Sequence, residues 1–414
     1  MTLLSRCAAP LRQEGGGSAT PESTREATSI PSSSPALSTP EAAASPLDAK
    51  IGQMLMVGFR GLEVDDEHFI VKDIRQRHLG GVVLFDYDIP TQQPVRNVAS
   101  PSQLKALVAS LQSASALPLL VAIDYEGGRV TRLKEEHGFP PTMSHQHLGA
   151  LNDLEQTYAQ AASMAETLAD LGINLNLAPV VDLCINPDNP IIARYERCFS
   201  ADPQIVIDHA LRFIQAHHER GIRCTLKHFP GHGSSSEDSH EGLVDVTGTW
   251  SQVELEPYRH IIRAGQAGAI MTAHVFNAQL DSDFPATLSQ TTVTGILREE
   301  LGYEGVVISD DMQMGAITNS YGFETAIQKA LEAGVDILAF ANNSVYEEDI
   351  AARAIEVIKR LVEAGVIGEE RITASYQRIQ RLKTRSASER YAFATGCRST
   401  VFSRSGLARR GSPR

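Results

Sequence analysis

One pattern of apolar and polar positions recurs along the middle of the chain. A helical stretch ends at a glycine, and a short apolar run follows directly. Glycine favours the left-handed conformation that closes many helices. Short runs rich in Val, Ile and Leu between helices are typical of parallel strands buried on both faces. The pattern occurs at Gly80–Gly81, Gly172, Gly221, Gly268, Gly305 and Gly334.

Two further apolar runs, at 53–59 and 118–124, bring the expected strands from six to eight. A helix expected between residues 346 and 365 has its apolar residues on one face, at Ile350, Ala354, Ile358 and Leu361. Alternating strands and helices predict an α/β fold with a parallel sheet. Eight such units over about 340 residues favour a single (β/α)8 TIM-type barrel. A doubly wound open sheet is the alternative, but no GxGxxG loop follows the first strand.

The two ends of the chain differ in composition from the middle. Residues 1–46 are rich in Ser, Pro and Ala, and residues 385–414 are basic and rich in Ser and Gly. Segments with so little apolar surface cannot offset the entropy lost on ordering. We therefore expect a disordered leader or linker at 1–46, one folded domain at 47–384, and a disordered tail at 385–414.

Composition limits the partners and the location. The formal net charge of −13 argues against a nucleic-acid surface, which needs basic patches. No apolar stretch reaches the ~18–20 residues of a transmembrane helix. We expect a cytoplasmic protein, monomeric, acting on a small molecule. The alternative, if the start is truncated, is an exported lipoprotein anchored at Cys7, although Arg6 is a poor neighbour for lipid attachment.

The cysteines are odd in number and show no CxxC spacing; they are Cys7, Cys184, Cys198, Cys224 and Cys397. We therefore expect neither a disulfide framework nor a structural zinc site. Cys224 lies in an apolar, strand-like run and is expected in the core.

Polar side chains gather where the expected strands end, which is where a barrel carries its active site. They are Asp124, Glu126, Arg129 and Arg132 after the third apolar run, Lys227, His228 and His232 after the fifth, His274 after the sixth, and Asp310 and Asp311 after the seventh. A single Asp at a strand end often only caps the next helix. Helix capping does not readily explain why polar residues follow four of the expected strands.

Asp238 and His240 lie two residues apart in a polar segment that we expect to form a loop over the barrel mouth. Most such loops are solvated surface. The chemical interpretation is an Asp that orients a His for proton transfer. A metal site is a further possibility, because His228, His232, Asp238 and His240 are all zinc-compatible. No HExxH or comparable spacing supports it, so we expect neither metal nor cofactor.

Two motifs carry a family resemblance. "KHFPGHGSSSEDSH" at 227–240 and "VVISDDMQMGAI" at 306–317 resemble the β-N-acetylglucosaminidase (β-hexosaminidase) branch of family 3 glycoside hydrolases. "AIDYEGGRVTRL", "NLAPVVDL", "RYERCFSADP" and "FPATLS" resemble the same branch in the expected order, so that the likeness covers essentially all of 47–384. Tyr125 and Val244 depart from the residues common at those places, Gln and Pro.

The resemblance implies roles for individual residues. Asp310 would be the nucleophile, His240 the acid/base, and Asp238 the residue that holds His240. The sugar would be bound by Asp124, Arg132, Arg197, Lys227 and His228. Glucosidase relatives of this family take a Glu acid/base from a second domain, and we expect no room for that domain in this chain.

The implied activity is retaining, exo-acting hydrolysis of terminal β-linked N-acetylglucosamine, from muropeptides in cell-wall recycling or from chitin oligomers. A His acid/base avoids like-charge repulsion with Asp310, and its unperturbed pKa is ~6.5. The alternatives are a phosphorylase of the same family, a metal-dependent hydrolase that uses the His cluster, and a non-catalytic sugar-binding protein.

Overall fold

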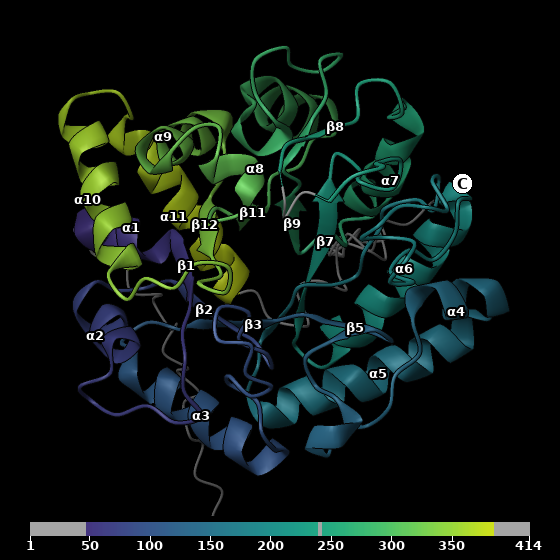
Figure 1. The fold of residues 1–414 in the computed structure, drawn as a ribbon, viewed down its shortest axis with the longest axis horizontal. Helices are drawn as coiled ribbons and strands as arrows, with labels where there is room; N and C mark the ends of the chain where they lie inside the picture. Colours follow the sequence, from purple (N-terminus) through teal and green to yellow (C-terminus); the bar gives the residue numbers. More distant parts are fainter. Residues whose placement is uncertain (1–46, 239–241, 385–414) are drawn as a thin grey trace, which may run out of the picture. The chain divides into compact units, whose positions relative to one another are not determined.

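The structure is a computed structural model that describes residues 47–238 and 242–384. At its centre is a closed barrel of parallel strands with helices around it (Figure 1). In chain order its strands are β1 (Leu55–Gly58), β2 (Gly81–Leu84), β3 (Leu120–Ile123), β6 (Leu175–Asn176), β7 (Arg223–Phe229), β9 (Ala269–Thr272), β11 (Val306–Asp311) and β12 (Ile337–Phe340). Each strand pairs with its neighbours in chain order, and β12 closes the barrel on β1. The eight expected strands and the TIM-type barrel are confirmed, and the open-sheet alternative is wrong.

The helices of the described residues are α1 (Leu47–Gln53), α2 (Phe69–Gln76), α3 (Pro101–Ala114), α4 (His145–Leu151), α5 (Leu154–Leu171), α6 (Pro203–Glu219), α7 (Glu256–Arg263), α8 (Gly315–Thr318), α9 (Phe323–Ala333), α10 (Ile350–Glu363) and α11 (Glu369–Thr384). Short 3-10 helices lie at η1 (Glu135–His137), η2 (Gln252–Leu255) and η3 (Ala286–Leu288), and η4 (Thr291–Glu300) is a π-helix. Two small sheets, β4 (Tyr125–Gly127) with β5 (Val130–Thr131) and β8 (Val244–Asp245) with β10 (Val275–Phe276), extend beyond the barrel.

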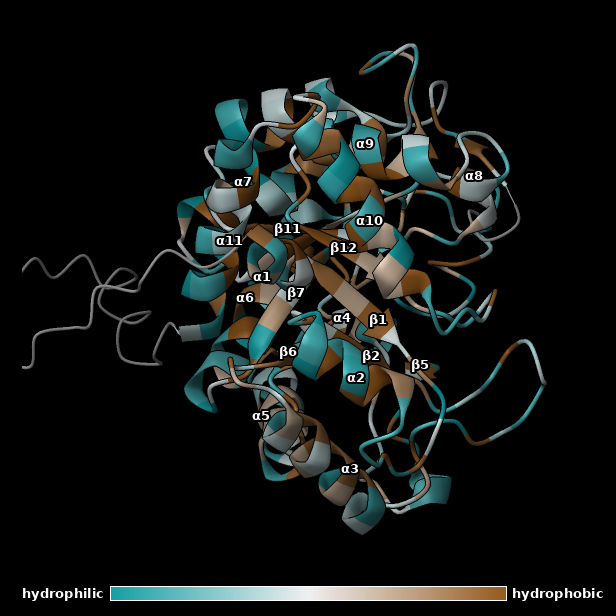
Figure 2. Ribbon diagram, turned by 90° about the vertical axis from the view of Figure 1, so that its left-hand side faces the viewer, coloured by the Kyte–Doolittle hydropathy of each residue, from teal (hydrophilic) through white to brown (hydrophobic). Residues whose placement is uncertain are grey.

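The core lies inside the barrel and between the barrel and its helices. Most barrel strands are buried along their whole length, and they appear brown in Figure 2 while the helices also carry hydrophilic teal residues. Helix α10 confirms its predicted face, since Ile350, Ala354 and Ile358 are fully buried. Each buried Ile or Leu contributes about 1.5–3 kcal/mol relative to an exposed one, so this face holds α10 on the barrel.

The predicted helix-ending glycines are partly confirmed. Gly172, Gly221 and Gly334 have φ values of 79°, 78° and 115°. The assignment was wrong at Gly80–Gly81, Gly268 and Gly305, because the left-handed residues of those segments are His78, Gly265 and Gly302. Gly268 is small for another reason: a Cβ there would lie 2.7 Å from the carbonyl oxygen of Cys224.

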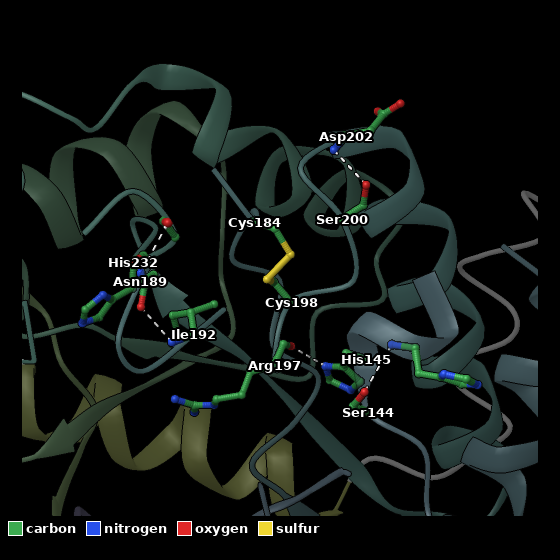
Figure 3. Close-up of a disulfide and its surroundings, with 12 residues drawn as sticks. Ser144, His145, Cys184, Asn189, Ile192, Arg197, Cys198, Ser200, Asp202 and His232 are labelled. Carbon is green, nitrogen blue, oxygen red and sulfur yellow. Dashed lines mark hydrogen bonds between the residues drawn. A yellow bond between two sulfur atoms is a disulfide. The ribbon is translucent and has the colours of Figure 1, made fainter. Parts of the chain in front are cut away.

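Two cysteines form a disulfide, Cys184–Cys198, in the loop between β6 and α6 (Figure 3). From the odd number of cysteines we expected no disulfide framework, and for Cys184 and Cys198 that expectation was wrong. The loop turns back on itself and brings the two Cα atoms to 5.6 Å, although they are 14 residues apart in the sequence. Cys198 packs with Ile191 and Ile192 in a small apolar cluster. Cys224 is fully buried and, among the described residues, takes part in no disulfide, as expected for a core residue.

Candidate active site

A cavity of about 470 Å3 opens at the carboxyl ends of the barrel strands. Seven of the eight residues assigned catalytic or sugar-binding roles line it: Asp124, Arg132, Arg197, Lys227, His228, Asp238 and Asp310. The eighth, His240, lies outside the described residues. The structure therefore brings together residues that are up to 186 positions apart in the sequence, counting from 124 to 310.

Asp310 lies opposite Asp124 across the barrel. Asp310 belongs to β11, Asp124 follows β3, and these strands are four places apart in either direction around the closed sheet. Oδ1 of Asp310 accepts a hydrogen bond of 2.8 Å from the backbone N–H of Asp311. Neither Asp caps a helix, because α8 begins after Met314. The helix-cap interpretation of this pair is wrong.

Asp311 and His274 hold the end of β11. The Asp311 carboxylate accepts N–H bonds of 3.1 Å from Gln313 and 2.9 Å from Ala341, the residue that follows β12. His274 is fully buried, and its Nε2 lies 2.9 Å from the carbonyl oxygen of Asp311. Both side chains therefore fix the strand end that presents Asp310.

An ion-pair network forms the wall opposite Asp310. Nζ of Lys227 lies 2.7 Å from Asp124 and 2.7 Å from Glu126. Arg197 binds both oxygens of Glu126, at 2.8 and 2.9 Å. Arg132 donates to Asp124 at 3.2 Å. The polar groups that face the cavity are thus held in place before any ligand arrives.

The same network keeps its carboxylates ionised. Burial alone would raise the pKa of Asp124, but the charges of Lys227 and Arg132 outweigh it and hold the pKa below its usual value. The pKa of Glu126 is likewise held far below its usual range, because Arg197 and Lys227 outweigh the effect of burial. A hydroxyl group that meets Asp124 therefore finds a hydrogen-bond acceptor.

His228 is oriented by a buried carboxylate. Its Nδ1 lies 2.7 Å from Oδ2 of Asp182, and its Nε2 lies 3.2 Å from Nη2 of Arg197. A guanidinium only donates, so the tautomer that suits both contacts accepts at Nε2 and donates from Nδ1. The ring of His228 is therefore held between a carboxylate and a guanidinium.

The sequence interpretation assigned no role to Asp182, Glu126 or Glu254. Asp182 follows the fourth apolar run at the end of "NLAPVVDL", and the rule that located Asp124 after the third run applies to it equally. Glu254 lies on η2, away from any strand end, and no local signal identifies it. It is almost completely buried, and its Oε2 accepts an N–H bond of 3.0 Å from Gly233.

Asp238 is half-buried and lines the cavity. Among residues 47–238 and 242–384, no cluster of three or more His, Cys, Asp or Glu side chains has an arrangement that would hold a metal ion. In the same part of the chain no helix is long and apolar enough to cross a membrane.

Comparisons with known proteins agree on one family. The glycosyl hydrolase family 3 N terminal domain matches residues 46–382. A β-hexosaminidase of Tolumonas auensis is 37% identical over 292 residues, which cover 70% of this chain and 83% of that protein. A β-hexosaminidase of Xylella fastidiosa is 36% identical over 324 residues, which cover 76% of this chain and 91% of that protein.

The chain also aligns with solved structures of β-N-acetylhexosaminidases. A family 3 β-N-acetylglucosaminidase from a Paenibacillus species aligns with a TM-score of 0.75 and 36% identity over 88% of this chain. The alignment covers 66% of the Paenibacillus chain, so this protein spans about two thirds of that relative's length. A β-N-acetylhexosaminidase from Beutenbergia cavernae aligns with a TM-score of 0.74 and 29% identity, over 82% of this chain and 99% of that one.

Proposed function

Because the chain belongs to glycosyl hydrolase family 3 and is a glycoside hydrolase, we propose that it removes terminal β-linked N-acetylglucosamine by a retaining mechanism. The observation that carries the proposal is the placement of Asp310 across one cavity from the network of Asp124, Lys227 and Arg197. A nucleophile on one side and fixed sugar-binding groups on the other are what a double displacement requires.

In the proposed reaction the terminal sugar lies against the ion-pair wall. The Asp124 carboxylate accepts from sugar hydroxyls, and Lys227, Arg132 and Arg197 donate to sugar oxygens. A site that pairs each hydroxyl discriminates strongly against sugars that lack one. Residues of four barrel strands, Met56, Val83, Met271 and Ala339, line the cavity from below.

The chemistry then proceeds in two steps. A carboxylate oxygen of Asp310 attacks the anomeric carbon, the glycosidic C–O bond breaks, and His240 gives its proton to the leaving oxygen. In the second step His240 takes a proton from water, which displaces Asp310 and releases the sugar with its β configuration retained. Asp238, which lines the cavity two residues earlier in the chain, orients the imidazole.

The test is a product analysis with trapping of the intermediate. Chitobiose and cell-wall muropeptides, tested side by side, distinguish the two substrate sources, and we expect β-N-acetylglucosamine to be the first product detected by NMR. A 5-fluoro N-acetylglucosaminyl fluoride should label Asp310 in the intact enzyme and leave Asp310→Asn unlabelled. Label on Asp311, or an α-anomer as first product, would overturn the mechanism.

The same assay separates the alternatives. Formation of N-acetylglucosamine 1-phosphate in phosphate buffer would identify a phosphorylase. Loss of turnover with a chelator would identify a metal-dependent hydrolase. Binding of N-acetylglucosamine without any turnover would identify a sugar-binding protein.

A further inference from the structure

Asn189 lies fully buried in the loop that the disulfide closes, residues 184–198, called the disulfide loop below. Its side-chain nitrogen donates to the backbone oxygens of His232, at 2.8 Å, and Gly233, at 3.3 Å. It also lies 3.0 Å from Oγ of Ser235. The amide nitrogen of Asn189 therefore contacts three residues of one turn, and that turn begins 43 positions further along the chain.

The side-chain oxygen of Asn189 holds its own loop. It accepts N–H bonds of 3.0 Å from Ile191 and 2.8 Å from Ile192. Ile192 in turn accepts from the N–H of Arg197 at 3.0 Å, directly before the disulfide at Cys198. Figure 3 shows Asn189 beside Ile192 and His232, with Arg197 below the disulfide. The same side chain therefore touches the turn leading to Arg197 and a segment beyond β7.

That second segment, residues 231–235, is called the anchor turn below, and it leads to Asp238. Its other side is held by Glu254, which accepts from the N–H of Gly233, and by Asp182, which accepts from the N–H of His232 at 2.9 Å. Asn186 of the disulfide loop donates to the carbonyl of Ser235 at 2.8 Å. The described residues of the anchor turn are all buried.

We propose that Asn189 is a positioning residue that fixes the anchor turn, and through it Asp238, relative to the sugar-binding Arg197. The inference rests on the proposed function, since it concerns the placement of the proton donor in that reaction. Without the amide, the carbonyls of His232 and Gly233 each lose one of their donors, and the N–H groups of Ile191 and Ile192 lose their acceptor. Leaving a buried group unpaired costs about 1–3 kcal/mol. The turn shifts to recover partners, and Asp238 shifts with it.

Proton transfer is more sensitive to such a shift than sugar binding is, because general acid catalysis needs a heavy-atom distance of about 2.6–3.2 Å. The need for an acid depends on the leaving group: a nitrophenol leaves without a proton, whereas an unsubstituted phenol gains much from one. Loss of Asn189 should therefore steepen the dependence of kcat/KM on leaving-group pKa. A role in overall stability alone would lower kcat/KM equally for every leaving group.

The experiment compares Asn189→Ala with the intact chain on a series of aryl β-N-acetylglucosaminides. We expect kcat/KM to fall about 30-fold for the phenyl glycoside and about threefold for the dinitrophenyl glycoside, part of the ~10²–10⁴-fold that a general acid supplies. Asn174→Ala is the matched control. Asn174 bridges Leu119 and Val121, at 2.8 and 2.9 Å, at the opposite end of the barrel. It should lower the melting temperature without changing the leaving-group slope.

Asn186→Ala serves as a second variant, because Asn186 is half-buried and its side chain makes one bond to the anchor turn. It should steepen the slope in the same direction but less. In an Asp238→Ala background, Asn189→Ala should have no further effect on the slope. A slope unchanged in both Asn variants would overturn the inference while leaving the proposed function intact. An intact chain that turns over no aryl glycoside would overturn both.

Discussion

Oδ2 of Asp182 lies 2.7 Å from Nδ1 of His228, which lines the cavity, and the Asp182 carboxylate is fully shielded from solvent. The same carboxylate accepts the backbone N–H groups of His228 and His232. Burial by itself would raise the pKa of Asp182, but the imidazole and these donors hold it below its usual value. One buried charge thus sets both the tautomer of His228 and the start of the anchor turn.

The first prediction is that Asp182→Asn lowers kcat/KM by about 10- to 100-fold, because a hydrogen bond to a charged group is worth about 1.5–3 kcal/mol. An Asn at this position can also turn its NH2 group toward Nδ1 of His228. Nδ1 would then have to accept, the ring proton would move to Nε2, and Nε2 would present a donor to the guanidinium of Arg197. Steady-state kinetics on an aryl glycoside gives the value, and the loss should be much smaller in a His228→Ala background. Asp188→Asn, an exposed residue of the same loop, is the control. Equal losses in both backgrounds would mean that Asp182 does not act through His228.

The barrel could be predicted because its signals are local. Each strand is a short apolar run beside a helix, and the polar residues that end the runs at Asp124, Lys227 and Asp310 identify one face. The family motifs then assigned roles to them. The pairing of β12 with β1, which closes the barrel, was predicted only from the number of strand–helix units. No local pattern in either strand specifies its partner.

The supporting contacts could not be predicted, because they join residues that are distant in the sequence. Asp182 and His228 are 46 positions apart, and Gly233 and Glu254 are 21 apart. An odd cysteine count gives no sign that two of the cysteines meet across a turn of the β6–α6 loop. Such pairings depend on how loops fold back over the barrel, which neither propensity nor periodicity specifies.

The second prediction concerns the pH dependence of stability. Burial, with a smaller contribution from the nearby Asp182 charge, raises the pKa of Glu254 to about 7, even though Gly233 donates to it. The folded state therefore binds this proton more tightly than the unfolded chain does. Stability is highest when Glu254 is protonated, and it falls as the pH rises from the unfolded pKa of ~4.3 through 7.

Glu254→Gln removes this ionisation. Relative to the intact chain, its free energy of unfolding should rise by on the order of 2–3 kcal/mol between pH 5 and pH 8. Urea denaturation at four pH values in that range measures the difference. Glu63→Gln, at an exposed position, should run parallel to the intact chain. A Glu254→Gln curve that also stays parallel would show that Glu254 does not ionise in this range.

The third prediction concerns the disulfide. Closing a loop of this length stabilises a protein by ~3 kcal/mol in the chain-entropy description, and the bond adjoins Arg197. The double variant Cys184→Ser/Cys198→Ser should melt several degrees lower and show a KM about tenfold higher, equivalent to ~1.4 kcal/mol of lost sugar binding. A reductant should lower the melting temperature of the intact chain but not that of the double variant. If the reductant leaves both unchanged, the two thiols are not bonded in solution.

The same experiment bears on location. Disulfides persist in oxidising compartments and are rare in the cytosol. A disulfide that forms in the protein isolated from its own cells would favour the exported alternative over the cytoplasmic location expected from the sequence.

The last prediction concerns His240, whose proposed role as acid/base follows from its motif. As an acid, His240 matters only when the leaving oxygen needs a proton, so His240→Ala should slow chitobiose hydrolysis by ~10²–10⁴-fold and dinitrophenyl glycosides much less. Hydrolysis of the glycosyl-enzyme still needs a base to activate water, so the intermediate should accumulate on Asp310 and give a burst of nitrophenol. Azide needs no base, and it should restore turnover and yield the β-glycosyl azide. Asp238→Ala should show a weaker form of the same behaviour, because Asp238 only orients the imidazole. Equal slowing of both substrates, with neither burst nor azide rescue, would remove His240 from the mechanism. His228 would then be the next acid/base to test, although its Nε2 already faces Arg197.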